Sequence, residues 1–519
     1  MKRGLLVLLL IIAGCASRRP EADDLPPRST SAPHALRIPE SLPVPPDTVL
    51  IEQLEDALDL RFRDEFDRFL DGRDPGELLE HATLTQTALD RGIFGPDALR
   101  IVGDELFDYE FRPEQGLGNG LAGRPGIAAG PHPAPNLRRV HAGTFGGPDS
   151  HNCSSCHLKG GPDGAGNRTQ NAFLRGDGRS TLGADERNPP HLLGLGPIAV
   201  LAREMTVDLQ HARAGALAEA ARRLEPVAVP LASKGVSFGS IEARPDGSVD
   251  TSRVEGVDAD LVVKPFGWKG HSASLPEMVE ESFRIHMGLL SPWGQSRLRD
   301  GPDPDQGDGA WYDADRDGVH HEVESGMVTT LAAYLAQLET PVIRPPAPAV
   351  LLERFARGRR LFDEIGCASC HRPALVLEDP VLEIRPLDPQ HAGKTPVRVD
   401  VARDGDSPKV EPEKVLGARH IARLFSDLKR HDMGPALATP SAQGSIPASA
   451  FLTRPLWGLA FTSPYLHDGR APTVDDAVRL HGGEGAPSRD RYLELSGEDR
   501  ASLRVFLLSL DREPKLFVP

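Results

Sequence analysis

Cys153-Ser154-Ser155-Cys156-His157 and Cys367-Ala368-Ser369-Cys370-His371 repeat one pattern: two cysteines separated by two residues, with histidine directly after the second. In this arrangement the two thiols can bond the vinyl carbons of one haem while the adjacent histidine ligates its iron. Zinc sites and dithiol redox motifs share the cysteine spacing, but the histidine in both copies favours haem. The sequence therefore predicts two covalently bound haem c groups, held by Cys153, Cys156, His157, Cys367, Cys370 and His371.

The fifth cysteine, Cys15, ends the stretch Ile12-Ala13-Gly14-Cys15, which follows a short apolar run. This start resembles a bacterial lipoprotein signal, so residues 1–14 are expected to be cleaved and Cys15 to carry the lipid that anchors the chain to a membrane. The apolar run is too short to span a bilayer comfortably by itself. Ala16 after the cysteine favours the outer membrane over the inner membrane or the cell surface. Haem attachment and lipidation together predict the bacterial periplasm.

Length and charge limit the organisation and the partners of the chain. Its 519 residues leave room for two or three domains. The formal charge of −16 makes nucleic acid an unsuitable partner and permits a small basic electron carrier. We expect a lipidated, proline-rich tether over 15–48, a haem domain over 49–345 and a second haem domain over 346–519, divided in a proline-rich stretch.

Local patterns predict a mainly α-helical fold. Apolar residues at helical spacing indicate an amphipathic helix over 50–69, and a helix over 350–365 is expected to lead into the second haem motif. Ser496-Gly497-Glu498-Asp499 is a capping-box pattern at the start of a terminal helix. G-x-x-L-F occurs at 103–107 and 358–362, which suggests an internal duplication. Alternating polarity predicts a short strand at 397–401.

Residues 313–324 match the calcium loop of an EF-hand, with carboxylates at positions one, three, five and twelve and glycine at six. Crowded oxygen ligands repel one another until a hard cation neutralises them. The alternative is an acidic turn without a metal. The predicted Ca²⁺ ligands are Asp313, Asp315, Asp317, the carbonyl of Val319, and Glu324, and a helix over 327–338 is expected to follow.

Further segments carry a resemblance to a known family. They are Leu193-Gly194-Leu195-Gly196, Pro265-Phe266-Gly267-Trp268-Lys269, His431-Asp432-Met433-Gly434, Pro455-Leu456-Trp457-Gly458 and Leu466-His467-Asp468-Gly469-Arg470. In this order they resemble the di-haem oxidoreductases of the peroxidase type, relatives of bacterial di-haem cytochrome c peroxidase and of MauG. The resemblance implies two cytochrome c-like haem domains with long loop insertions and a few short strands.

The resemblance also implies candidate ligands and catalytic groups. In the peroxidase relatives a methionine ligates the electron-transfer haem, so Met433 is the distal candidate for the second haem, with His431 as the competing ligand. Met433 could instead be core packing. His191 and His286 are candidates on the distal side of the first haem, and either could be a structural histidine. The relatives use a glutamate after the Gly-Leu-Gly strip as acid and base, where this chain offers Glu204 instead.

Other aromatic and charged residues have more than one interpretation. Trp268 and Trp457 are candidates for an electron bridge or for packing, and His467 and Arg470 for haem propionates or turn caps. The favoured function is reduction of hydrogen peroxide or a related oxidant at the first haem, with electrons entering at the second from a small carrier such as a cytochrome c or cupredoxin. Its rivals are a non-catalytic electron-transfer cytochrome and MauG-like oxidation of a protein.

Overall fold

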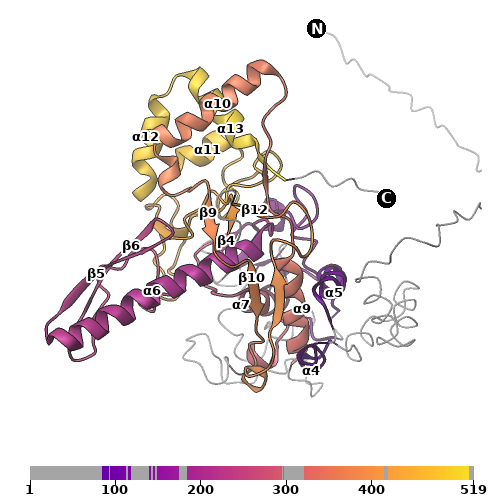
Figure 1. Cartoon of the computed structure of the whole chain (residues 1–519). Helices are drawn as coiled ribbons and strands as arrows, with labels where there is room; N and C mark the ends of the chain where they lie inside the picture. Colours follow the sequence, from indigo (N-terminus) through magenta and orange to yellow (C-terminus); the bar gives the residue numbers. More distant parts are fainter. Residues whose placement is uncertain are drawn as a thin grey trace, which may run out of the picture. The chain divides into compact units, whose positions relative to one another are not determined.

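The computed structural model describes residues 84–92, 94–112, 115–117, 140–141, 144–145, 149–174, 184–294, 296, 321–413 and 419–512. The chain divides into two units, residues 1–46 and 47–519, and every described residue lies in the second (Figure 1). Cys15, the expected helix over 50–69 and most of the calcium loop lie outside the described residues. No helix in the described part of the chain is long and apolar enough to cross a membrane.

Two pairs of closely packed helices lie next to the two haem motifs. In the first pair α5 (Pro96–Asp108) packs on α9 (Ser325–Ala336), and in the second α10 (Ala349–Glu364) packs on α13 (Gly497–Leu508). A Cβ on Gly103 of α5 would overlap Tyr334, and one on Gly358 of α10 would overlap the Ser502 carbonyl. The two copies of G-x-x-L-F therefore use their glycine in the same way, to let two helices cross closely.

One helix of each pair lies beside a haem motif. The backbone N–H of Cys153 donates to the carbonyl of Phe107 at the end of α5. Helix α10 ends at Glu364, three residues before Cys367 and one residue from the predicted end, and Gly366 then adopts a left-handed conformation with φ 90°. Ser496 caps α13 by accepting a hydrogen bond from the N–H of Asp499, which confirms the predicted helix start.

The buried residues form a large and a small apolar core. The large one takes residues from both sides of position 345, including Leu335 of α9 and Val399 of β11 (Val397–Asp400). The small one joins α10 and α13 through Phe362, Leu503 and Phe506. Part of the C-terminal segment therefore packs with N-terminal helices, and the division at 345 stays a prediction.

A long helix, α6 (Leu195–Arg223), packs against an antiparallel sheet of β5 (Val227–Ser233), β6 (Val236–Ala243) and β7 (Val249–Asp250). Figure 1 shows the helix running beside this sheet. Only the first part of α6 is continuously buried, from Leu195 to Ala202. The helix thus enters the large core at its N-terminal end, directly after the Gly-Leu-Gly strip.

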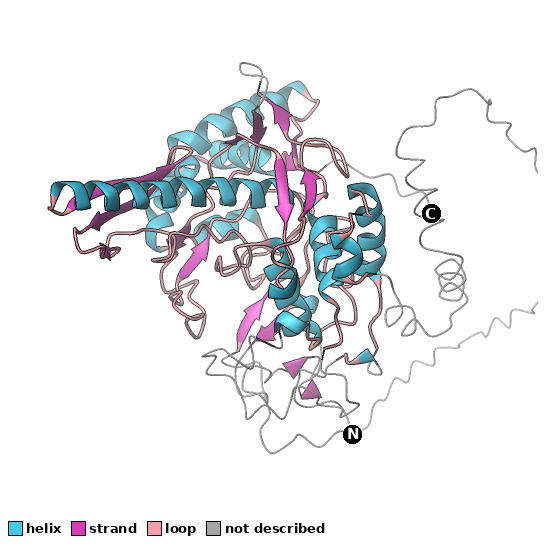
Figure 2. Ribbon diagram, turned by 60° about the horizontal axis from the view of Figure 1, so that its bottom comes forward, coloured by secondary structure: helices cyan, strands magenta, loops and turns pink. Residues whose placement is uncertain are grey.

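The remaining elements are short (Figure 2). The short helices are α4 (Gln86–Asp90), α7 (Leu275–Ser282), the single wide turn η4 (Phe283–Met287), α11 (Val474–Arg479) and α12 (Ala486–Glu494). The paired strands are β3 (Ala172–Leu174) with β4 (Asp185–Arg187), β8 (Val342–Ile343) with β16 (Leu510–Asp511), β10 (Val381–Ile384) with β11, β14 (Arg430–Asp432) with β15 (Ala450–Leu452), β1 (Val140–His141) with β2 (Thr144–Phe145), and β9 (Leu375–Leu377) with β13 (His420–Ala422) and β12 (Glu411–Pro412). Helices thus predominate, with short sheets between them, and β11 confirms the strand predicted at 397–401.

Gly358→Ala is expected to lower the free energy of unfolding by about 1–3 kcal/mol, because the new methyl group forces α10 away from α13. Gly215→Ala is the matched control, since nothing lies within 4 Å of a Cβ on that exposed residue of α6. The control should raise the stability by roughly 0.5–1 kcal/mol through helix propensity. Denaturant titration of both variants measures the difference, and equal effects would contradict a close helix crossing.

Candidate haem sites

The first haem motif lines a cavity whose walls come from several segments. Cys153, Cys156 and His157 lie on one side of it. The ring of His157 is fixed by a hydrogen bond from Nδ1 to the carbonyl of Gly164, at 3.2 Å. A histidine that binds a metal through Nε2 is usually held in this way by a carbonyl at its other nitrogen. Burial also lowers the pKa of His157 to about 4, which keeps the imidazole neutral and able to ligate.

The second haem motif lines a second cavity with the same local arrangement. Cys367, Cys370 and His371 all face it. Nδ1 of His371 donates to the carbonyl of Phe425 at 3.0 Å, and burial lowers its pKa to about 4. All four cysteines of the two motifs are free thiols, so they are available for bonds to haem. The residues present therefore fit two c-type haems, one at each motif.

The wall of the first cavity contains two histidine–carboxylate pairs. Nε2 of His271 lies 2.9 Å from a carboxylate oxygen of Glu281, which also accepts from Ser272 Oγ at 2.6 Å. Nδ1 of His286 donates to Asp149 at 2.8 Å, and the His286 side chain is 39% exposed whereas Asp149 is 6% exposed. His286 lies in η4, directly after α7, whose N-cap is Ser274. It therefore lies between the cavity and solvent, as a proton carrier would.

Glu204 lies elsewhere in the structure. It is not among the residues that line either cavity. Its carboxylate pairs with Lys234 at 2.6 Å and accepts hydrogen bonds from the backbone N–H groups of Glu378 and Asp379. These contacts connect α6 to the segment after β9, and they do not support the prediction that Glu204 is the acid at the first haem. Glu281 is the glutamate in that wall, and no sequence motif distinguished it.

The two cavities share a wall. Trp268, Asn188, Pro189 and Pro190 line both of them. The indole N–H of Trp268 donates to the carbonyl of Asn188 at 2.8 Å, and Arg454 lies over its ring at 5.4 Å. Trp268 thus has the position expected for a bridge between two haems. Trp457 instead packs tightly against Gly194, where a Cβ would overlap its ring.

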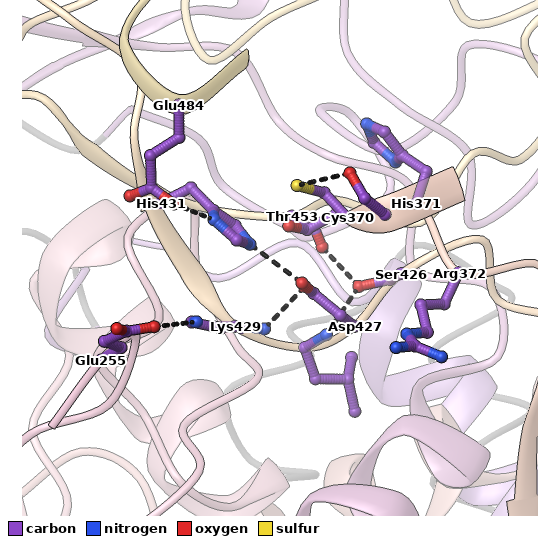
Figure 3. A network of polar contacts seen from close by, with 12 residues as sticks. Glu255, Cys370, His371, Arg372, Ser426, Asp427, Lys429, His431, Thr453 and Glu484 are labelled. Atoms are coloured by element: carbon purple, nitrogen blue, oxygen red, sulfur yellow. Dashed lines mark hydrogen bonds and ion pairs between the residues drawn. The ribbon is translucent and has the colours of Figure 1, made fainter. Parts of the chain in front are cut away.

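His431 is held between two carboxylates on the wall of the second cavity. Nδ1 contacts Glu484 at 2.7 Å and Nε2 contacts Asp427 at 2.9 Å, and Figure 3 shows the ring between these two side chains. Burial alone would lower the pKa of His431, but the hydrogen bonds to Asp427, Cys370 and Glu484 raise it to about 11. A charged imidazole with both nitrogens occupied cannot ligate iron, so the competing assignment to His431 is disfavoured.

The other predicted residues divide between the cavity and the surrounding structure. Met433 and His467 line the second cavity, and so does His191, which the sequence analysis placed at the first haem. The ring of His191 stacks on Trp457 at 5.4 Å. Arg470 pairs with Asp468 and donates to the carbonyl of Ala436, so it acts in a local turn. Two guanidinium groups that no sequence motif distinguished, those of Arg454 and Arg489, also line this cavity.

Comparison with known proteins confirms the resemblance inferred from the sequence. Residues 394–510 match the model of the family described as "Di-haem oxidoreductase, putative peroxidase". A search of curated protein sequences found no match. The match covers Met433, Trp457 and His467 but begins after the second haem motif.

Two solved structures are similar over part of the chain. Kuenenia stuttgartiensis hydrazine synthase has 16% identity and a TM-score of 0.21, and the match covers 37% of this chain and 57% of the other. A MauG-like protein associated with microbial copper homeostasis has 16% identity and a TM-score of 0.24, with 52% and 77% covered. The chain thus spans little more than half the length of the hydrazine synthase chain. TM-scores this low do not establish a shared fold.

Glu281→Gln is expected to destabilise the protein by about 1–2 kcal/mol at neutral pH. Burial raises the pKa of Glu281, but hydrogen bonds from His271 and Ser272 outweigh it and hold the pKa at about 2. A depressed pKa contributes stability above the ordinary carboxyl pKa, and this contribution is lost as the pH falls from about 4.5 towards 2. Denaturant titrations at several pH values should show the difference from wild type shrinking in that range. A stability difference between wild type and Glu281→Gln that does not change with pH would contradict the lowered pKa of Glu281.

Proposed function

We propose that this protein is a c-type di-haem oxidoreductase that reduces hydrogen peroxide or a related oxidant at the first haem, with electrons supplied through the second. The observation that carries the proposal is the pair of cavities, each lined by one Cys-x-x-Cys-His motif, with Trp268 in their common wall. Bound haem would supply the redox-active iron. His157 and His371 would each be the proximal ligand of one haem. Each ring is oriented by a hydrogen bond from Nδ1 to a carbonyl, that of Gly164 for His157 and that of Phe425 for His371.

The first cavity has the groups that peroxide reduction needs, since two protons must reach the oxygen atoms as two electrons arrive. His286 is part exposed and lines the cavity, so it can take up a proton from solvent and release it inside. Asp149 orients its ring through the hydrogen bond to Nδ1. Glu281 and His271 form a second pair that can hold a peroxide oxygen by hydrogen bonds. His286 is thus kept as a catalytic candidate, whereas Glu204 is not.

Electron supply is assigned to the second cavity. Trp268 lies between the two sites and its indole can relay electrons between them. Arg454 is buried, which lowers its pKa to about 10, and no carboxylate of the described residues forms an ion pair with it. Its guanidinium is therefore a suitable partner for a haem carboxylate. A small cytochrome c or cupredoxin is the proposed donor, and a lipid anchor at Cys15 would keep the protein at the periplasmic face of a membrane.

His286→Gln and Asp149→Asn are expected to lower the rate of peroxide consumption, the first by roughly 100-fold, because both interrupt proton supply. The pH dependence of the rate should flatten in His286→Gln. Glu204→Gln is the control, since Glu204 lies outside both cavities. Reduced, full-length, haem-loaded protein is mixed with peroxide and followed by stopped-flow absorbance. Rates unchanged in His286→Gln would remove this histidine from the mechanism.

Mass spectrometry and spectroscopy of the purified protein test the function itself. Two haem adducts are expected, one at Cys153 and Cys156 and one at Cys367 and Cys370. A high-spin haem that reacts with peroxide supports a peroxidase. Two low-spin haems that ignore peroxide in every redox state would leave an electron-transfer cytochrome, and a radical on an added protein partner would favour MauG-like oxidation.

Calcium is proposed to hold the start of α9. Glu324, the last residue of the predicted calcium loop, directly precedes this helix, which crosses α5 beside the first haem motif. Asp315→Asn is expected to weaken calcium binding and to abolish the rise in melting temperature that calcium gives the wild-type protein. Glu324 is avoided because it lies at the helix start. A calcium-independent melting temperature in the wild type would contradict the site.

A further inference from the structure

His481 lies on the wall of the second cavity, near the histidine of the haem motif. It follows α11 by two residues, and its backbone N–H donates to the carbonyl of Val478. Its side chain lines the same cavity as His371. Nδ1 of His481 donates to the carbonyl of Ala477 at 2.8 Å, so the ring is fixed through that nitrogen and Nε2 is left for another partner. This is the arrangement already described for His371.

The distance between the two rings matches a shared iron. The ring centroids of His371 and His481 are 6.4 Å apart, with the ring planes at 53°. An imidazole nitrogen lies about 2 Å from a first-row metal ion, so two imidazoles on opposite sides of one ion have centroids roughly 6 Å apart. Direct ring stacking is closer than this, as in the pair Phe451 and His467 at 4.6 Å. The spacing between the two rings therefore matches that of two imidazoles that share one metal ion.

Four other possible ligands of this cavity have contacts that fix their positions. His431 has both nitrogens on carboxylates. His467 stacks on Phe451, and His191 stacks on Trp457. Met433 packs beside the loop that carries His481: its methyl carbon would lie 3.3 Å from a Cβ on Gly485, and its carbonyl lies against Gly482. Met433 thus supports the position of that loop.

We infer that His371 and His481 are the two axial ligands of the second haem. The inference rests on the proposed haem at Cys367 and Cys370, and it replaces Met433 as the distal ligand. A haem with two histidine ligands has no open position, so oxidants would be excluded from this site and confined to the first cavity. Its reduction potential would also lie below that of a haem with histidine and methionine ligands, which favours onward transfer of electrons.

The test compares His481→Met with Met433→Leu in full-length, haem-loaded protein. Wild type and Met433→Leu should lack the near-infrared band that a methionine sulfur gives ferric haem, and they should share one low potential for this haem. His481→Met should gain that band and a higher potential. His431→Gln is the matched control, because it removes a neighbouring histidine without changing the ligands.

The opposite results would overturn the inference: a methionine band in wild type that disappears in Met433→Leu. Should His481→Met fail to fold, His481→Gly with added imidazole is the second variant, and the low-spin spectrum should return as imidazole fills the position. Electron paramagnetic resonance of wild type alone distinguishes two nitrogen ligands from nitrogen and sulfur. Absence of a haem adduct at Cys367 and Cys370 by mass spectrometry would refute the proposed function rather than the ligand assignment.

Discussion

The close crossing of two helices beside each haem motif is the contact on which the rest of the structure depends. Gly103 permits α5 to approach α9, and Gly358 permits α10 to approach α13. The first motif contacts its helix pair directly, through the hydrogen bond from the N–H of Cys153 to the carbonyl of Phe107. A side chain at either glycine would force the two helices apart.

The common wall of the two cavities is built from segments far apart in the chain. Residues 188–190 come before α6, and Trp268 comes after the β5–β6–β7 sheet, yet their side chains line both cavities. Lys269, next to Trp268, is fully buried and donates to three carbonyls of the segment 447–450. This cation fixes the position of the tryptophan with respect to the C-terminal residues of the second cavity.

The two cavities differ in the chemistry of their walls. The first has carboxylates paired with histidines, one of which reaches solvent. The second has His481 with a single nitrogen engaged, and the charged His431 with both engaged. A site that supplies protons suits reaction with a small oxidant, and a site with a fixed second ligand suits electron transfer. The proposed division of labour follows from this difference.

The sequence by itself determined the features that depend on short-range spacing. The haem motifs, the helix before Cys367, the cap at Ser496 and the strand at 397–401 all follow from local patterns. The family match over 394–510 agrees with the segments that carried the resemblance.

Only the tertiary structure decided which residues face each cavity. It pairs Glu204 with Lys234, places His191, one of two candidates for the first haem, on the wall of the second cavity, and adds Glu281 to the wall of the first and His481 to that of the second. These residues are contributed by loops and helix ends whose side-chain directions depend on packing between distant segments. The sequence around His157 and His371 therefore does not predict which other residues line the two cavities.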